Sequence, residues 1–182
     1  MDVGRHPNIE LWTNSEVVRV RGKAGDFKVS VLLKARCVDV NECTACGECA
    51  DACPVAVPNE FDLGLGTRKA IYQPFPQAVP SAYIRDIDAC LGHFPLACGR
   101  CARACEKNCI DYDEQDVVEE IGVGSIVVAT GFDFYDPGEA SEYGYKRFHN
   151  VVSSLELERL LSASGPTSGF LQRFTDGETP KR

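Results

Sequence analysis

The chain has 182 residues, enough for one domain or two small ones. Its apolar fraction of 44% and charged fraction of 25% are typical of soluble globular proteins, and its net charge of −8 argues against a nucleic-acid-binding surface, which needs a basic patch. No apolar run approaches the length of a membrane span, and the first residues carry no secretory signal peptide, so we expect a cytoplasmic protein with reduced thiols.

Residues 8–36 are rich in strand formers. The segment FKVSVLLK alternates apolar Phe27, Val29 and Val31 with polar side chains, which is typical of a half-buried strand. A turn segment with two glycines, RGKAGD, stands directly before it. We therefore expect a short strand followed by a hairpin in this part of the chain.

The next stretch, from Cys37 to about Tyr112, has a different composition. It holds all ten cysteines of the chain, nine of them between Cys43 and Cys109. Prolines recur, and long periodic segments are missing. A stretch this small usually needs disulfides or metal in order to fold. The sequence therefore predicts a cysteine-rich module set into another fold.

Two further elements are expected after the cysteines. The apolar run Ile126–Ala129 predicts a buried strand that ends in a tight turn at Thr130 and Gly131. The segment SSLELERLLSAS predicts a helix, because Ser153 and Glu156 fit a capping box and three leucines form an apolar stripe. The remaining residues are expected to be loop.

The segment CTACGECADACP carries the most specific signal. Its spacing, Cys-x2-Cys-x2-Cys-x3-Cys-Pro, is the run found in bacterial ferredoxins that bind [4Fe–4S] clusters. Thiolates at every third position of a tight loop can bind three corners of one cubane, so Cys43, Cys46 and Cys49 are expected to share a cluster. In the two-cluster arrangement the fourth cysteine, Cys53, binds the other cluster.

A second, altered run follows. Here seven residues, in place of the usual two, separate Cys90 from Cys98, and the next cysteines are Cys101 and Cys105. The two-cluster rule then gives two ligand groups. One group is Cys43, Cys46, Cys49 and Cys105, and the other is Cys53, Cys90, Cys98 and Cys101. The long gap changes the reach of Cys90, so Cys109 stays open as its substitute.

Two other roles for the thiols are considered. Disulfides need an oxidising compartment, which nothing in the sequence supports. Structural zinc usually takes two pairs of ligands, and the pairs 46/49 and 98/101 have suitable spacing, but zinc would leave four other cysteines of the motifs without a role. The spacing therefore favours iron–sulfur clusters.

Several nearby residues are not expected to be ligands. Cys37 lies before the first run and is expected to be a buried or free thiol. His93 lies in the seven-residue gap and is expected to be a solvated loop residue, because cluster ligands are overwhelmingly thiolates. Arg100, Arg103 and Lys107 interleave the second run, and we expect them to form a solvated helix face.

The chain resembles a known family in three segments. These are CTACGECADACPVAVPNEFD, RKAIYQPFPQAVPSAYIRD and GSIVVATGFDFYDP. Together they are similar to the A subunits of the CoB–CoM heterodisulfide reductases, iron–sulfur flavoproteins of methanogens with relatives in other anaerobes. The resemblance covers nearly the whole chain.

The resemblance implies an α+β fold class, with a dicluster bacterial-type ferredoxin module inserted into part of a thioredoxin-reductase-like FAD-binding α/β domain. Residues 37–115 would be the insert, and residues 1–36 and 116–182 would be parts of the flavoprotein domain. The turn Ala129, Thr130 and Gly131 would lie near FAD. The family's phosphate-binding glycines are missing from this chain, so we expect a fragment that does not hold FAD tightly alone.

The resemblance also implies an oxidoreductase subunit that passes electrons between FAD and partner clusters. In the family this serves reduction of CoM-S-S-CoB coupled by flavin-based bifurcation to ferredoxin reduction. The implied partners are the other heterodisulfide reductase subunits, electron-donor subunits of hydrogenase or formate dehydrogenase, and ferredoxin. No catalytic residue is assigned, and the fragment alone is expected to be inactive. The alternative is a stand-alone electron carrier of the two-cluster ferredoxin type.

Overall fold

The computed structural model describes residues 3–92 and 98–181. The chain forms two compact units. The first runs through Val55 and continues over Lys69–Ala129, and the second joins Ala56–Arg68 to the residues from Thr130 onward. Among the helices in the described residues, none is both long enough and apolar enough to cross a membrane.

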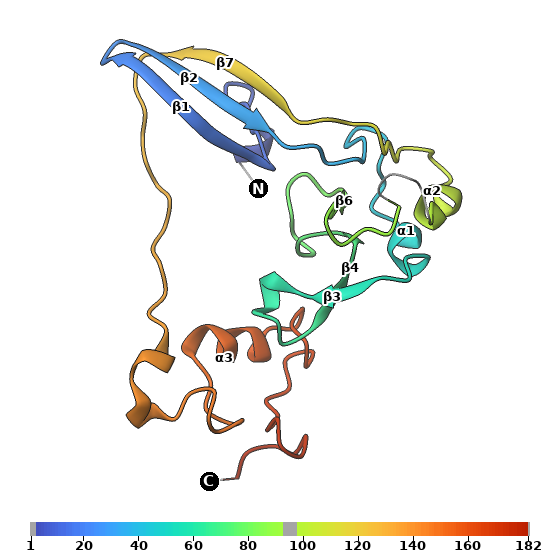
Figure 1. Cartoon of the computed structure of the whole chain (residues 1–182), viewed down its shortest axis with the longest axis vertical. Helices are drawn as coiled ribbons and strands as arrows, with labels where there is room; N and C mark the ends of the chain where they lie inside the picture. Colours follow the sequence, from blue (N-terminus) through green and yellow to red (C-terminus); the bar gives the residue numbers. More distant parts are fainter. Residues whose placement is uncertain (1–2, 93–97, 182) are drawn as a thin grey trace. The chain divides into compact units, whose positions relative to one another are not determined.

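A three-stranded antiparallel sheet belongs to the first unit (Figure 1). Its strands are β1 (Ser15–Lys23), β2 (Asp26–Leu33) and β7 (Val117–Val123), with β2 in the centre. Lys23 pairs with Asp26 across a two-residue turn, in which Gly25 adopts a φ of +89° that a side chain would disfavour. The predicted hairpin is therefore confirmed, whereas the short strand expected before it is wrong, because residues 8–14 form no strand.

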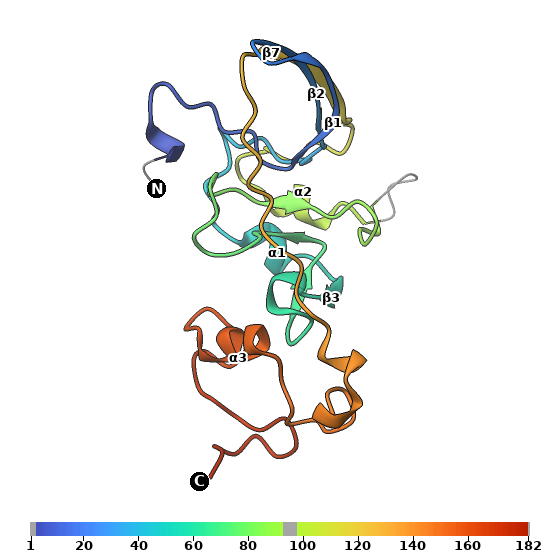
Figure 2. The ribbon, with the colours of Figure 1, turned by 90° about the vertical axis from the view of Figure 1, so that its left-hand side faces the viewer.

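The alternation of β2 gives the sheet one covered face. Val29 and Val31 are buried, whereas Lys28 just before them is exposed. The register of β1 shifts between Val17 and Arg19, which is a β-bulge and adds to local twist. Figure 2 shows the three strands curving together. The half-buried strand expected over residues 27–34 is thus confirmed.

The strand expected at Ile126–Ala129 is wrong. These residues form no strand, and Val127 and Val128 are 90% and 76% exposed. The segment that pairs with β2 lies earlier, at Val117–Val123, where seven consecutive residues are in register with Phe27–Leu33. The ladder ends before the apolar run begins, and the run has no partner strand among the described residues.

The cysteine-rich part of the first unit is built from short elements. They are α1 (Glu48–Asp51), β5 (Ile71–Tyr72), β6 (Ile84–Arg85) and α2 (Arg100–Ala104). A short 3-10 helix, η1 (Val3–Arg5), lies before β1 in the chain, and η denotes a 3-10 helix throughout. Their core consists of Val38, Cys49, Cys53, Ala70, Ile71, Cys101 and Cys109. Four of these seven residues are cysteines, so this core offers little apolar side-chain volume without a bound group.

A long-range bridge closes this part of the first unit. Val38 pairs with Ile110 in an antiparallel bridge, and the amide of Asp39 donates to the carbonyl of Cys109 at 2.8 Å. The bridge brings the stretch just before the first cysteine run beside the stretch just after the second. Cys109 is thereby fixed next to the first run.

In its described residues, the second unit contains six short elements. These are β3 (Ala56–Pro58), η2 (Glu60–Asp62), the start of β4 (Thr67–Lys69), η3 (Pro137–Glu139), η4 (Ser141–Tyr143) and α3 (Ser154–Leu161). The predicted helix is confirmed as α3, and its capping box is formed in both directions between Ser153 and Glu156. Of its leucines, only Leu160 is fully buried.

An ion pair ties α3 to η2 within the second unit. The Nε atom of Arg159 donates to Oδ1 of Asp62 at 2.9 Å, and both side chains are about nine-tenths buried. Asn59 donates to the other carboxylate oxygen of Asp62 at 2.7 Å. Arg159 also lies 4.4 Å from the ring centre of Phe61. These contacts hold together two segments that are 97 residues apart in the chain.

Candidate iron–sulfur sites

The first cysteine run folds as a tight loop that leads into α1. Ala45 and Gly47 both have a positive φ, of 55° and 96°, so the backbone turns sharply between the cysteines. The amide of Cys43 donates to the carbonyl of Asp39, which fixes the start of the loop. This conformation allows three side chains that are three residues apart to line one small cavity.

The first thiol cavity has a volume of about 80 Å³. Five cysteines line it: Cys43, Cys46, Cys49, Cys105 and Cys109. The structure thus brings together the four residues that the two-cluster rule groups here. It adds Cys109, whose Sγ lies 3.5 Å from the Sγ of Cys105. The cavity therefore has one thiol more than the four corners of a cubane require.

The second thiol cavity is lined by the other predicted group, Cys53, Cys90, Cys98 and Cys101. Ile71 and Tyr112 also line it, and its volume is only about 10 Å³. The thiols would have to spread apart to admit a cluster. Cys90 lies in this lining, whereas Cys109 lies in that of the first cavity. The geometry therefore favours Cys90 over Cys109 as a ligand of the second group.

Burial keeps several of these thiols protonated in the cluster-free chain. It raises the pKa of Cys49 to about 12 from an ordinary value of 9.0. Burial, and then the neighbouring Cys105, raise the pKa of Cys109 to about 12. Burial also raises the pKa of Cys101, against the opposing effect of its hydrogen bond with Tyr112. Because cluster ligands are thiolates, loading of these cavities has to release protons.

The described side chains do not form the converging group of ligands that a single metal ion needs. Among the described residues, no three His, Cys, Asp or Glu side chains converge on a point where one ion would fit. Thiols that bind a cubane each bind a different iron atom, so they surround a cavity instead of converging. The cysteines of the alternative zinc set fall in different cavities, the 46/49 pair in the first and the 98/101 pair in the second.

Most other residues singled out in the sequence lie outside both thiol cavities. The exception is Lys107, which lies beyond the end of α2 and lines the first cavity, so the helix face expected for it is wrong. Cys37 is fully buried and lines neither of them, and all ten cysteines are free. Arg100 and Arg103 are exposed, as expected for a solvated helix face. Ala129, Thr130 and Gly131, the expected flavin contacts, are exposed and belong to no helix or strand. His93 lies outside the described residues.

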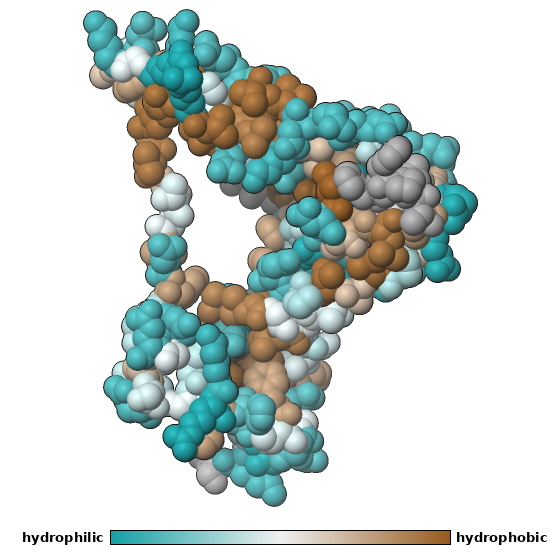
Figure 3. Space-filling view, viewed as in Figure 1, coloured by the Kyte–Doolittle hydropathy of each residue, from teal (hydrophilic) through white to brown (hydrophobic). Residues whose placement is uncertain are grey.

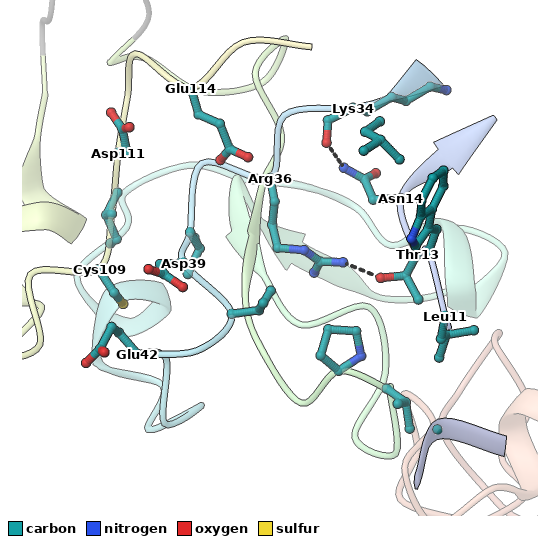
Figure 4. A pocket seen from close by; sticks show the side chains of 18 of the residues that line it. Leu11, Thr13, Asn14, Lys34, Arg36, Asp39, Glu42, Cys109, Asp111 and Glu114 are labelled. Atoms are coloured by element: carbon teal, nitrogen blue, oxygen red, sulfur yellow. Dashed lines mark hydrogen bonds between the residues drawn. The ribbon is translucent and has the colours of Figure 1, made fainter. Parts of the chain in front are cut away.

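A larger cavity of about 940 Å³ lies beside the first thiol cavity in the same unit (Figure 4). In it, Nη2 of Arg36 donates to Oγ1 of Thr13 at 3.0 Å. Val38, Lys107, Cys109 and Ile110 line both this cavity and the first thiol cavity. Cys109 therefore borders both cavities.

No protein-family model matches the chain. Similar proteins are, however, known. The chain is 49% identical over all of its 182 residues to the A subunit of the H2:CoB–CoM heterodisulfide, ferredoxin reductase of Methanothermobacter marburgensis. It is 48% identical over its full length to the iron–sulfur A subunit of the CoB–CoM heterodisulfide reductase of Methanocaldococcus jannaschii.

A third relative is the A subunit of the ferredoxin:CoB–CoM heterodisulfide reductase of Methanosarcina acetivorans, which is 44% identical over 175 residues, or 96% of the chain. The chain spans 27% of the length of the first two relatives and 22% of the third. It therefore corresponds to one segment of these subunits.

Proposed function

We propose that the chain is an electron-transfer segment carrying two [4Fe–4S] clusters. The premise is that the whole chain is related to a segment of the A subunits of the CoB–CoM heterodisulfide reductases. The observation that carries the proposal is the separation of nine cysteines into two cavities, five around the first and four around the second. Bound clusters of this type exchange single electrons. The protein would act as an oxidoreductase subunit.

The residues of the chain have distinct parts in this function. Cys43, Cys46, Cys49 and Cys105 would hold the first cluster, and the four thiols of the second cavity would hold the other. The positive φ values at Ala45 and Gly47 shape the loop that presents the first three thiols. The cysteines bind clusters and break no substrate bond, so no catalytic residue is proposed in this chain.

The wider assembly is part of the proposal. Residues 37–115 would be a ferredoxin-like insert in a thioredoxin-reductase-like FAD domain, and the clusters would relay electrons between FAD and partner clusters. The exposed residues Ala129, Thr130 and Gly131 would reach FAD only in the longer protein. The names of the relatives refer to hydrogen, ferredoxin and the CoB–CoM heterodisulfide, and the name of a further relative, from Methanococcus maripaludis, also refers to formate. We propose the corresponding donor subunits and ferredoxin as partners, with heterodisulfide reduction as the overall activity.

The proposal is tested by analysis of the anaerobically purified chain. Two cubanes would give about eight iron and about eight sulfide per chain. The control is Cys37→Ser, which changes a thiol outside both cavities and should keep the full iron content. About four of each would contradict the second cluster, and zinc without sulfide would contradict the proposed function as a whole.

A further inference from the structure

Arg85 is a buried cation that forms no ion pair with the described residues. It ends β6, and only 4% of its surface is exposed. Its Nε and Nη1 atoms have no hydrogen-bond partner among the described residues. An unpaired guanidinium in a protein interior is costly unless a negative charge lies nearby. Among the described residues no carboxylate forms an ion pair with Arg85, although Glu114 and Asp111 act on the thiol of Cys37 beside it. The position of Arg85 therefore favours a further anion nearby.

The two side chains against Arg85 do not supply that charge. Its guanidinium carbon lies 4.6 Å from the ring centre of Tyr112, which is a cation–π contact. The guanidinium also interacts with the thiol of Cys37, but burial raises the pKa of that thiol, so it stays neutral near pH 7. Both contacts are with uncharged groups.

Tyr112 connects Arg85 to the second thiol cavity. The Oη atom of Tyr112 lies 2.8 Å from the Sγ of Cys101, and both residues line that cavity. Once Cys101 is a thiolate ligand, it can only accept, so the phenol becomes the donor. The guanidinium is then separated from a ligand sulfur by one aromatic ring.

We propose that Arg85 is the buried counter-cation of the cluster in the second cavity, and that it raises the reduction potential of that cluster through space and through Tyr112. A cubane with four thiolate ligands is an anion, and its reduction adds one electron and one further negative charge. A fixed positive charge in a poorly hydrated interior stabilises the reduced form more than the oxidised form. The hydrogen bond to the Cys101 sulfur acts in the same direction.

The test is a redox titration of both clusters, followed by electron paramagnetic resonance, in the anaerobically purified chain. Arg85→Gln should lower one of the two midpoint potentials by at least about 59 mV, which is a tenfold change in a one-electron equilibrium. Arg85→Lys keeps the positive charge, so its midpoint potential should stay close to that of the wild type. Tyr112→Phe removes only the hydroxyl and should lower the potential of the same cluster by a smaller amount.

The matched control is Arg100→Gln. Arg100 is adjacent in sequence to Cys101 but exposed, so solvent screens its charge, and the shift should be small. The inference would be overturned if Arg85→Gln and Arg100→Gln shifted the midpoint potential equally. It would also be overturned if Arg85→Gln shifted the potential of a cluster whose potential Tyr112→Phe leaves unchanged. If Arg85→Gln loses iron, the Tyr112→Phe variant provides the test instead. Unchanged midpoint potentials in Tyr112→Phe would then overturn the inference.

The inference rests on the proposed function, but the two can fail separately. Iron and sulfide are counted in every sample before titration. A wild-type chain without two clusters would contradict the proposed function. If both clusters are present but their potentials do not change when the charge at position 85 is removed, the role of Arg85 is contradicted and the proposed function is not.

Discussion

Cys90 and Cys109 are the two thiols whose roles the spacing of the cysteines leaves open. In the structure they line different cavities, Cys90 with the second group and Cys109 with the first. The second cavity has only four thiols, so each of them is required for a fully ligated cubane. The first cavity has five, so one is in excess.

Cys90→Ser should therefore halve the iron content of the chain, from about eight to about four per chain, because the second cluster loses a ligand. Cys109→Ser should keep about eight, because four thiols remain around the first cavity. Iron and sulfide assays on the two variants, purified side by side without oxygen, measure the difference. The reverse pattern would show that Cys109 is a ligand and Cys90 is not.

Local spacing predicts which thiols share a loop but not which residues surround them. The first run indicates a shared site for Cys43, Cys46 and Cys49 because all three lie on one turn. The place of Cys109 depends on the bridge between Val38 and Ile110, which pairs residues 72 positions apart and leaves no periodic signal. The contact of Arg85 with Tyr112 is likewise long-range, so no motif indicates it.

At the scale of elements, the sequence predicts what local patterns encode. The alternation over Phe27–Leu33 predicts β2, and the capping box predicts the start of α3. The apolar run after β7 misleads because hydrophobicity alone marks a segment that prefers burial but does not supply a partner strand. The segment VVEEIGV, with two adjacent glutamates, has a weaker pattern but lies in register with β2.

At this scale, the ion pair between Asp62 and Arg159 is expected to hold α3 in place. Asp62→Ala would leave Arg159 charged and buried without its partner, and breaking a buried pair in this way typically costs about 3–5 kcal/mol. A cost of that size is comparable with the whole stability of a small unit. We expect the amides of α3 to lose protection from hydrogen exchange in this variant.

Lys146→Ala is the control for this change, because it breaks the ion pair of Lys146 with Asp136, whose side chains are 67% and 51% exposed. Exposed pairs contribute only about 0–1 kcal/mol, so exchange in α3 should stay close to wild type. Similar exchange in the two variants would mean that the buried pair does not hold α3 in place.

At the scale of the whole molecule, the exposed apolar side chains favour self-association. They gather in the extended segment after β7, where Figure 3 shows apolar residues at the surface. Six residues there are more than two-fifths exposed: Ile126, Val127, Val128, Phe132, Phe134 and Tyr135. An extended segment with exposed β-branched side chains and unpaired backbone groups can pair with another chain.

Replacing Val127 and Val128 together by serine should therefore raise the soluble concentration of the chain and lower its light scattering. The change removes the two most exposed valines of the segment and lowers its strand propensity. Leu161→Ser is the comparison: it also removes an exposed apolar side chain, 54% exposed, but at the end of α3, where the backbone already bonds within the helix. Equal gains in solubility from both changes would point to general surface hydrophobicity, whereas a gain confined to the valine pair would locate self-association in the extended segment.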